Sequence, residues 1–169
     1  MTDADRRALL LGGLMTTFGA ALAGEAAASP LDPAQTQLVL PADLKWTTPL
    51  GAPPKSFESV MLSGALDKPG LYFTLVRWWP GWMSGPHTYV TDRLCAVVSG
   101  AWWINSGADF DPAACVPAPA GSFIRRVAGT PHYDGVIVGA KEPAVIAIAG
   151  IAPVGAKFLD VGKPPIRKL

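Results

Sequence analysis

The sequence contains two histidines, His87 in "GPHTYV" and His132 in "GTPHYDG". Imidazole is the commonest metal ligand in proteins and the usual carrier of protons near neutral pH, so these rings are the first candidates for chemistry. Tyr89 and Arg93 follow shortly after the first histidine. Asp134 follows shortly after the second. Together these side chains would supply two imidazoles, a phenol, a guanidinium and a carboxylate.

One interpretation of these residues is a metal centre. His87, Tyr89 and His132 would then be the ligands of a divalent transition metal such as Fe, Mn, Cu, Ni or Zn. Two imidazoles alone hold such an ion weakly, so Tyr89, Asp134 or a water molecule must complete the ligand set. The guanidinium of Arg93 stays protonated and repels a dication unless a carboxylate, that of Asp134 or of Asp92, lies between them. We therefore expect weak metal binding.

The second interpretation needs no metal. The histidines would exchange protons, Tyr89 would donate a hydrogen bond to a developing negative charge, and Arg93 would hold a substrate carboxylate. Tyr89, Arg93 and Asp134 would then be catalytic in a dehydration, an isomerisation or the opening of a lactone. If Arg93 is structural instead, Asp134 is expected to form its ion pair. A pocket that binds a small molecule without catalysis is a third alternative.

Short apolar stretches separated by Gly and Pro must position these residues. Between Phe57 and Val154 none of the stretches has the periodicity of a helix, and the pattern predicts an all-β sandwich or barrel. Side chains two residues apart on a strand share a face, so the residues after each histidine are expected to face one interior. The predicted strands lie in LYFTLVRWW, LCAVVSG, GSFIRRV, HYDGVIV and PAVIAIAGIAPV.

The spacing of glycines around the histidines resembles the two sequence motifs of the cupin superfamily. In cupins the positions of His87, Tyr89 and Arg93 usually hold His, His and Glu, and the second motif supplies a further His at the position of His132. This sequence therefore keeps two of the four usual ligands, His87 and His132. The flanking sequence is similar to that of small secreted single-domain cupins of bacteria, of the ChrR-like type. The first motif matches Gly81, His87, Tyr89, Arg93 and Gly100, and the second matches Gly121, Val127, Gly129 and His132.

The resemblance implies a single cupin barrel, also called a double-stranded β-helix or jelly roll, over residues 57–158. Its two motifs face each other across the interior, so His87 and His132 are expected on opposing inner walls, within reach of one ion or ligand. Such a pocket is expected to bind a divalent metal and to act on a small molecule as an oxidoreductase. Residues 29–56 are expected to form an extended arm, and residues 159–169 a C-terminal tail.

The N-terminus has the pattern of an export signal. Arg6 and Arg7 precede an uncharged run over residues 8–24, which is shorter than the ~20 residues that span a bilayer. We expect a signal peptide over residues 1–28 and a periplasmic or secreted protein. The two arginines favour the twin-arginine type over an ordinary secretory signal, although Asp5 stands where Ser or Thr is commonest.

Charge and cysteine content bear on partners and on stability. The 14 basic and 13 acidic residues are scattered and give a formal net charge of +1, which indicates neither nucleic acid nor an anionic membrane as a partner. A small-molecule ligand is expected, and a homodimer formed through a strand edge or the outer tryptophans. Cys95 and Cys115 either form a disulfide in an oxidising compartment or are two buried thiols.

Overall fold

The computed structural model describes residues 31–32 and 34–169. The predicted signal peptide over residues 1–28 lies outside the described residues. The chain divides into two units, Met1–Leu40 and Pro41–Leu169. In the described part of the first, the carboxylate of Asp32 accepts hydrogen bonds from the Ala34 amide and the Gln35 side chain. Across residues 31–32 and 34–169, no helix is long and apolar enough to cross a membrane.

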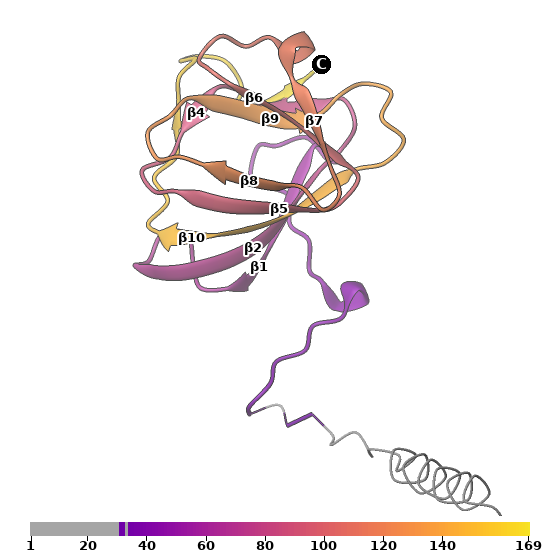
Figure 1. The fold of residues 1–169 in the computed structure, drawn as a ribbon, viewed down its shortest axis with the longest axis vertical. Helices are drawn as coiled ribbons and strands as arrows, with labels where there is room; N and C mark the ends of the chain where they lie inside the picture. The colour runs from indigo at the N-terminus through magenta and orange to yellow at the C-terminus, as the bar shows by residue number, and fades with distance from the viewer. Residues whose placement is uncertain (1–30, 33) are drawn as a thin grey trace, which may run out of the picture. The chain divides into compact units, whose positions relative to one another are not determined.

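Within Pro41–Leu169, five strands form one antiparallel sheet in the order β1-β2-β10-β5-β8. Figure 1 shows these strands one below another, from β8 to β1. Strands distant in sequence pair along their whole length, since β10 runs beside β2 from Ala144 opposite Trp78 to Ala152 opposite Gly70. The strands are β1 (Phe57–Ser63), β2 (Gly70–Trp78), β5 (Arg93–Ser99), β8 (Phe123–Arg126) and β10 (Ala144–Ala152).

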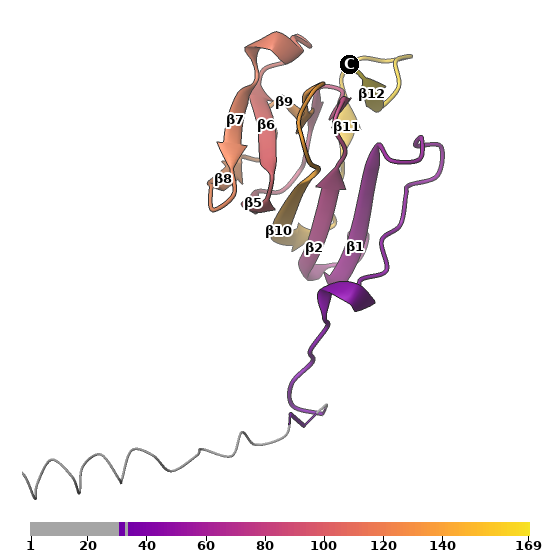
Figure 2. The same ribbon diagram turned by 90° about the vertical axis from the view of Figure 1, so that its right-hand side faces the viewer.

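The second sheet has seven strands and carries both histidines. Its main order is β11-β4-β9-β3-β12, and β6 joins β9 to β7. In Figure 2, β6 and β7 lie apart from β1 and β2 of the first sheet. The strands are β3 (Trp82–Ser84), β4 (His87–Thr88), β6 (Ala101–Ser106), β7 (Val116–Pro119), β9 (His132–Val136), β11 (Lys157–Phe158) and β12 (Ile166–Lys168).

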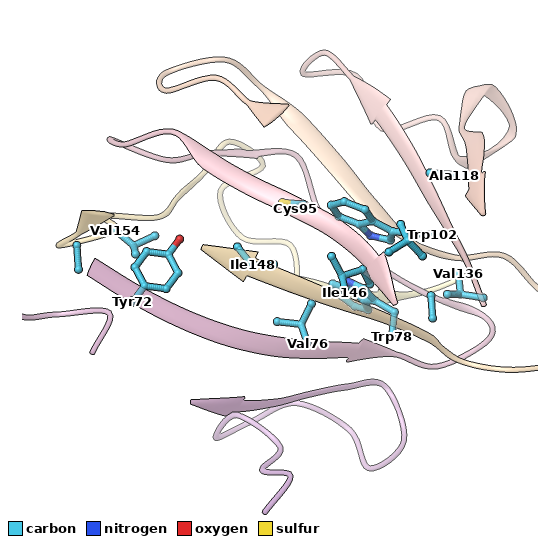
Figure 3. Close-up of a cluster of buried hydrophobic side chains, with 13 residues drawn as sticks. Tyr72, Val76, Trp78, Cys95, Trp102, Ala118, Val136, Ile146, Ile148 and Val154 are labelled. Carbon is cyan, nitrogen blue, oxygen red and sulfur yellow. The ribbon is translucent and has the colours of Figure 1, made fainter. Parts of the chain in front are cut away.

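Alternation along the strands sends one set of side chains into the core. On β2, every second residue from Tyr72 to Trp78 is buried, Val76 among them, whereas the residues that alternate with them are half-buried or exposed. Ile146 and Ile148 of β10 face the same core, which Trp102 of the second sheet completes. Figure 3 shows the apolar side chains of this core gathered between the strands. The predicted all-β architecture, with alternating strands and Gly-Pro punctuation, is confirmed.

The segments on either side of the barrel also contact it. Thr47, ten residues before β1, forms an isolated bridge with Ser59 of β1. At the other end, β12 pairs with β3 and so extends the second sheet beyond Phe158. Two short 3-10 helices, η1 (Pro41–Asp43) and η2 (Pro112–Ala114), complete the elements of this unit.

The two cysteines are buried thiols. Cys95 and Cys115 are both free, so of the two alternatives the disulfide is not formed. Burial raises the pKa of each thiol to about 11. Both groups therefore stay protonated at neutral pH and pack as small apolar side chains.

Candidate functional site

Each histidine ring is oriented by a carbonyl two residues before it. Nδ1 of His87 donates to the Gly85 carbonyl at 2.8 Å, and Nδ1 of His132 donates to the Thr130 carbonyl at 3.0 Å. In both cases the intervening residue is proline. Because a carbonyl only accepts, Nδ1 carries the proton and the lone pair of each neutral ring is on Nε2. The repeated X-Pro-His sequence is the signal for this arrangement, and the motif spacing alone misses it.

Burial keeps both rings neutral. His87 and His132 are each only 3% exposed. Burial lowers the pKa of His87, and it lowers the pKa of His132 to about 4, in both cases against the opposing attraction of the Asp134 carboxylate. At neutral pH each ring therefore offers an Nε2 lone pair, which is the form that binds a metal or accepts a proton.

The two histidines are neighbours on paired strands of one sheet. β4 and β9 run antiparallel with His87 directly opposite His132, and the ring centroids are 4.4 Å apart. Directly opposed residues of an antiparallel pair point to the same face, which brings the rings together. The prediction of opposing inner walls is therefore wrong, whereas the rings do lie within reach of one ion or ligand.

Asp134 completes a compact group with the histidines. It lies two residues after His132 on β9, so both side chains have the same orientation. One ligand atom from each of His87, His132 and Asp134 lies within 4.8 Å of the other two, and all three residues are buried. Trp102 donates from Nε1 to the Oδ1 atom of Asp134 at 3.2 Å. The predicted acidic candidate therefore lies beside both imidazoles.

Arg126, which sequence analysis did not select, is the ion-pair partner of Asp134. Its Nη2 lies 3.2 Å from Oδ2 of Asp134, and the two side chains are only 8% and 10% exposed. Nη1 of Arg126 donates to the Asn105 carbonyl at 3.0 Å, and its buried Nε has no hydrogen-bond partner in the part of the chain that the structure describes. The acidic charge of the site is thus largely balanced before any ion or ligand binds.

Strand alternation determines which carboxylate each of the two adjacent arginines of β8 binds. Arg125 is exposed and donates from Nε to Asp92 at 2.8 Å, whereas Arg126 is buried and pairs with Asp134. The expectation that Arg93 pairs with Asp134 is therefore wrong. The "RR" dipeptide carried the signal, because one of two adjacent arginines on a strand must face inward and then needs a buried carboxylate.

Tyr89 and Arg93 reach the cavity where the chain crosses between sheets. β4 ends at Thr88, and β5, which belongs to the other sheet, begins at Arg93. The amide of Gly129 donates to the Tyr89 carbonyl at 2.8 Å and holds the crossing. Gly129 has a φ of 72°, which strains any residue with a side chain. The two residues therefore face the site because of this crossing, and not because of a continuous strand.

The Tyr89 ring contacts both histidines and Arg93. Its centroid is 4.9 Å from that of His87 and 5.5 Å from that of His132, and the Arg93 guanidinium lies 4.2 Å from it. Nε of Arg93 donates to the Tyr72 hydroxyl at 3.1 Å. Burial raises the pKa of Tyr89 although Arg93 opposes the shift, so the phenol is protonated at neutral pH and acts as a hydrogen-bond donor.

These side chains line one cavity of about 810 Å³. Residues 49–53, which precede β1, line it as well, so the predicted arm region contributes part of its wall. A volume of this size is in the range of small-molecule sites. All five residues selected from the sequence line the cavity, together with Trp102 and Arg126, which the sequence analysis did not place in the site.

The donor set fits a divalent transition metal that is held weakly. Two neutral imidazoles and one carboxylate are the ligand types of the facial sites that bind such ions. The Arg126 ion pair reduces the charge that Asp134 offers, and the guanidinium of Arg93 adds a repulsive charge. Tyr89 contributes as a neutral phenol unless an ion displaces its proton.

No protein-family model and no curated protein matches the sequence. The fold is nevertheless similar to those of solved structures. The polyketide cyclase RemF from Streptomyces resistomycificus is 15% identical over 77% of this chain and 89% of that chain, with a TM-score of 0.62. A cupin-2 domain protein from Rhodospirillum rubrum is 16% identical over 79% of this chain and 86% of that chain, with a TM-score of 0.55.

A sugar phosphate isomerase of the cupin superfamily from Silicibacter pomeroyi is 19% identical over 71% of this chain and 80% of that chain, with a TM-score of 0.55. At these identities the likeness shows the fold alone. The chain has the cupin jelly-roll fold, as the motif spacing predicted, and the ChrR-like subtype stays a prediction.

Proposed function

We propose that this protein binds a divalent transition metal on His87, His132 and Asp134 and acts on a small molecule held in the cavity. The observation that supports the proposal most directly is the convergence of the three ligand atoms within 4.8 Å. The solved structures that share the fold include proteins named as a polyketide cyclase and as a sugar phosphate isomerase, which supports a small-molecule substrate. When bound, the ion would supply Lewis-acid activation or a redox centre of the oxidoreductase type.

The chain's own residues divide the remaining tasks. The Nδ1 hydrogen bonds of His87 and His132 leave Nε2 of each ring with the free lone pair and fix the orientation of the ring. Tyr89, as a protonated phenol, donates a hydrogen bond to an oxygen of the substrate. Arg93, stacked on that phenol, binds an anionic group of the substrate and fixes its orientation. The apolar walls exclude water from the bound molecule.

A second candidate function is metal-free binding or acid–base chemistry at the same residues. The observation that favours it is the Arg126–Asp134 ion pair, which occupies the carboxylate that a metal would need. The two imidazoles would then accept and return protons, with Tyr89 and Arg93 as donors to the substrate. A pocket without catalysis, serving only to bind its ligand, uses the same contacts.

Elemental analysis of protein purified without a histidine tag, after expression with its native N-terminus, separates these candidates. We expect Fe, Mn, Cu, Ni or Zn at less than one ion per chain. The metal should disappear in His87→Ala/His132→Ala and in Asp134→Asn. Asp92→Asn is the matched control, because that carboxylate binds Arg125 outside the cavity, and it should keep the metal.

Two results would overturn the metal proposal. Retention of the metal in the double histidine variant would identify it as adventitious. A wild-type protein that stays empty at millimolar metal would transfer the function to the metal-free candidate.

A further inference from the structure

The buried end of the cavity carries more positive charge than negative charge. Two arginines, Arg93 and Arg126, line this end, and Asp134 is the one buried carboxylate among the lining residues. Asp67, the other carboxylate of the lining, is exposed to solvent. Asp134 pairs with Arg126, so among the residues that the structure describes Arg93 has no carboxylate as a counter-charge. An unbalanced charge in a largely buried site is costly unless an anion accompanies it.

The same two arginines have hydrogen-bond donors to spare. Arg93 donates from Nε to Tyr72, and this is its one hydrogen bond to a residue that the structure describes. The buried Nε of Arg126 has no hydrogen-bond partner among residues 31–32 and 34–169. A guanidinium presents its donors as a planar fork that matches the two oxygens of a carboxylate. These available donors suit an oxyanion with more than one acceptor atom.

The rest of the cavity is mainly apolar. Its volume of about 810 Å³ far exceeds what a two-carbon acid fills, so a ligand must also cover apolar walls. Aromatic rings from both sheets contribute to these walls, which suits a flat ring system. The apolar lining includes Phe57, Val76, Trp78, Trp102, Ile148 and Phe158.

We propose that the ligand is a mostly apolar acid, an aromatic or fused-ring body with one carboxylate or comparable oxyanion. The oxyanion binds Arg93 at the buried end, and the ring body packs on the apolar walls toward residues 49–53. The inference rests on the proposed function, because it takes the cavity as the substrate site. It adds the chemical class of the substrate and does not depend on a metal.

Titration of the metal-stripped wild-type protein with three probes tests the inference by calorimetry and by tryptophan fluorescence. The probes are 2-naphthoate, its neutral isostere 2-naphthamide, and acetate, which has the charge without the ring body. We expect 2-naphthoate to bind at least tenfold more tightly than either of the others. Equal binding of the naphthoate and the amide would overturn the proposal, as would equal binding of acetate.

The Arg93→Gln variant should lose the preference for the naphthoate over the amide. Arg125→Gln is the matched control, because Arg125 is exposed and binds Asp92, and it should keep that preference. Arg93→Lys keeps the charge without the planar fork and should keep part of it, which guards against loss of folding in the Gln variant. An unchanged preference in Arg93→Gln would overturn the assignment to this arginine. Because metal content is measured separately, acid binding without metal would leave this inference standing while the metal proposal falls.

A second inference comes from the outer face of the five-stranded sheet. Phe73 and Leu94 flank Ala149 in register, and Phe123 is paired with Ala96 in the next row. Strand alternation places these side chains away from the core, and Phe73, Leu94 and Phe123 are 38%, 48% and 68% exposed. The face thus presents apolar residues from four adjacent strands. The large exposed residues on it are Leu71, Phe73, Leu94, Val98, Phe123 and Ile151.

We infer that this face binds a second copy of the chain. The six large residues are each at least 38% exposed and form an apolar patch across four adjacent strands, the kind of patch that marks a protein–protein interface. The charged residues of the face, Arg77 and Arg125, are each in an ion pair, with Glu58 and Asp92. Such a face can meet a copy of itself without repulsion between unpaired charges.

This apolar face is not the surface of outer tryptophans that sequence analysis gave as one possible dimer interface. All six tryptophans are described by the structure, and each is buried or half-buried. Trp79, for example, donates to Glu58 and contacts Arg77 within the same chain. This apolar face is therefore mainly aliphatic and lies on β2, β10, β5 and β8, with Phe73 and Phe123 as its aromatic members.

Light scattering coupled to size-exclusion chromatography tests this interface. We expect the wild type to elute as a dimer at micromolar concentration and Phe73→Lys/Leu94→Lys to be monomeric. Val138→Lys is the control, because Val138 is 64% exposed on a loop, and it should remain dimeric. A monomeric wild type or a dimeric double variant would overturn the inference, and circular dichroism of the variant verifies that it is folded.

Discussion

At the residue scale, the site combines two well-oriented bases with atypical neighbours. His87 and His132 were predictable from the sequence because they are the whole histidine content and match motif positions. The "RR" dipeptide indicates that one arginine needs a buried carboxylate, but the choice of Asp134 depends on which strands become neighbours in the fold. Arg126 reaches Asp134 through strand placement, whereas Arg93 does not. The residue types thus indicated the chemistry of the site. Which arginine pairs with Asp134 in the folded chain determined the charge balance of the site.

Replacement of Tyr89 by His should strengthen metal binding. The variant adds a third imidazole in contact with the other two and restores the residue usual at this position in the resembled family. We expect the dissociation constant for Zn or Ni to fall at least tenfold, which is about 1.4 kcal/mol. Calorimetry on stripped protein measures it. Tyr89→Phe is the control for the phenol, and equal affinities in all three proteins would show that this position does not contact the ion.

The buried histidines should make stability depend on pH. The pKa of His132 is lowered from 6.5 to about 4 in the folded protein, so only the unfolded chain takes up this proton between those values. The contribution is fully present above pH 6.5 and is lost as the pH falls toward 4, with a slope of up to about 1.4 kcal/mol per pH unit for each such histidine. Urea unfolding of the metal-free protein from pH 7.5 to 4.5 measures the slope.

His132→Gln should show a smaller loss over this pH range than the wild type. Asp92, whose pKa is lowered by the Ala128 amide and by Arg125, titrates at lower pH and does not interfere. An identical slope in His132→Gln and the wild type would contradict the assignment.

At the scale of elements, alternation and turn residues were sufficient to predict the strands, but not their pairing. The β4–β9 pair joins segments far apart in sequence, and nothing local specifies that His87 lies opposite His132. The change of sheet after Thr88 was also hidden, because the motif reads as one continuous strand. Gly129, recognised as a motif glycine, holds this crossing through its bond to Tyr89.

Gly150 of β10 provides a test of how strands support the site. An added Cβ would lie 2.7 Å from the hydroxyl of Tyr72, which accepts the hydrogen bond from Arg93. Gly150→Ala should therefore displace Tyr72, destabilise the protein by about 1–3 kcal/mol and weaken 2-naphthoate binding. Urea unfolding and calorimetry measure the two effects. Val138→Ala, on an exposed loop, should change neither. Wild-type behaviour of Gly150→Ala would show that the site tolerates the shift.

At the scale of the whole molecule, the export of the protein from the cytoplasm is a proposal that rests on the sequence. We expect an exported protein whose mature chain begins near Ser29, because basic residues, an apolar run and small residues occur in the order of a signal peptide. Mass spectrometry of periplasmic material measures this start. Replacement of Arg6 and Arg7 by Lys should block export if the route is twin-arginine, whereas an ordinary secretory signal would tolerate it. A periplasmic protein that still begins at Met1 would contradict cleavage.

The Pro-His geometry has a consequence for how this site can change over evolution. Each imidazole is oriented by a carbonyl of its own tripeptide, so its orientation does not depend on the residues at positions 89 and 93. Substitutions at those positions can therefore alter the reaction while leaving two correctly tautomeric bases in place. The barrel and its two histidines would then stay the same while positions 89 and 93 change. Single substitutions at these two positions would be enough to move the site between metal-assisted and metal-free chemistry.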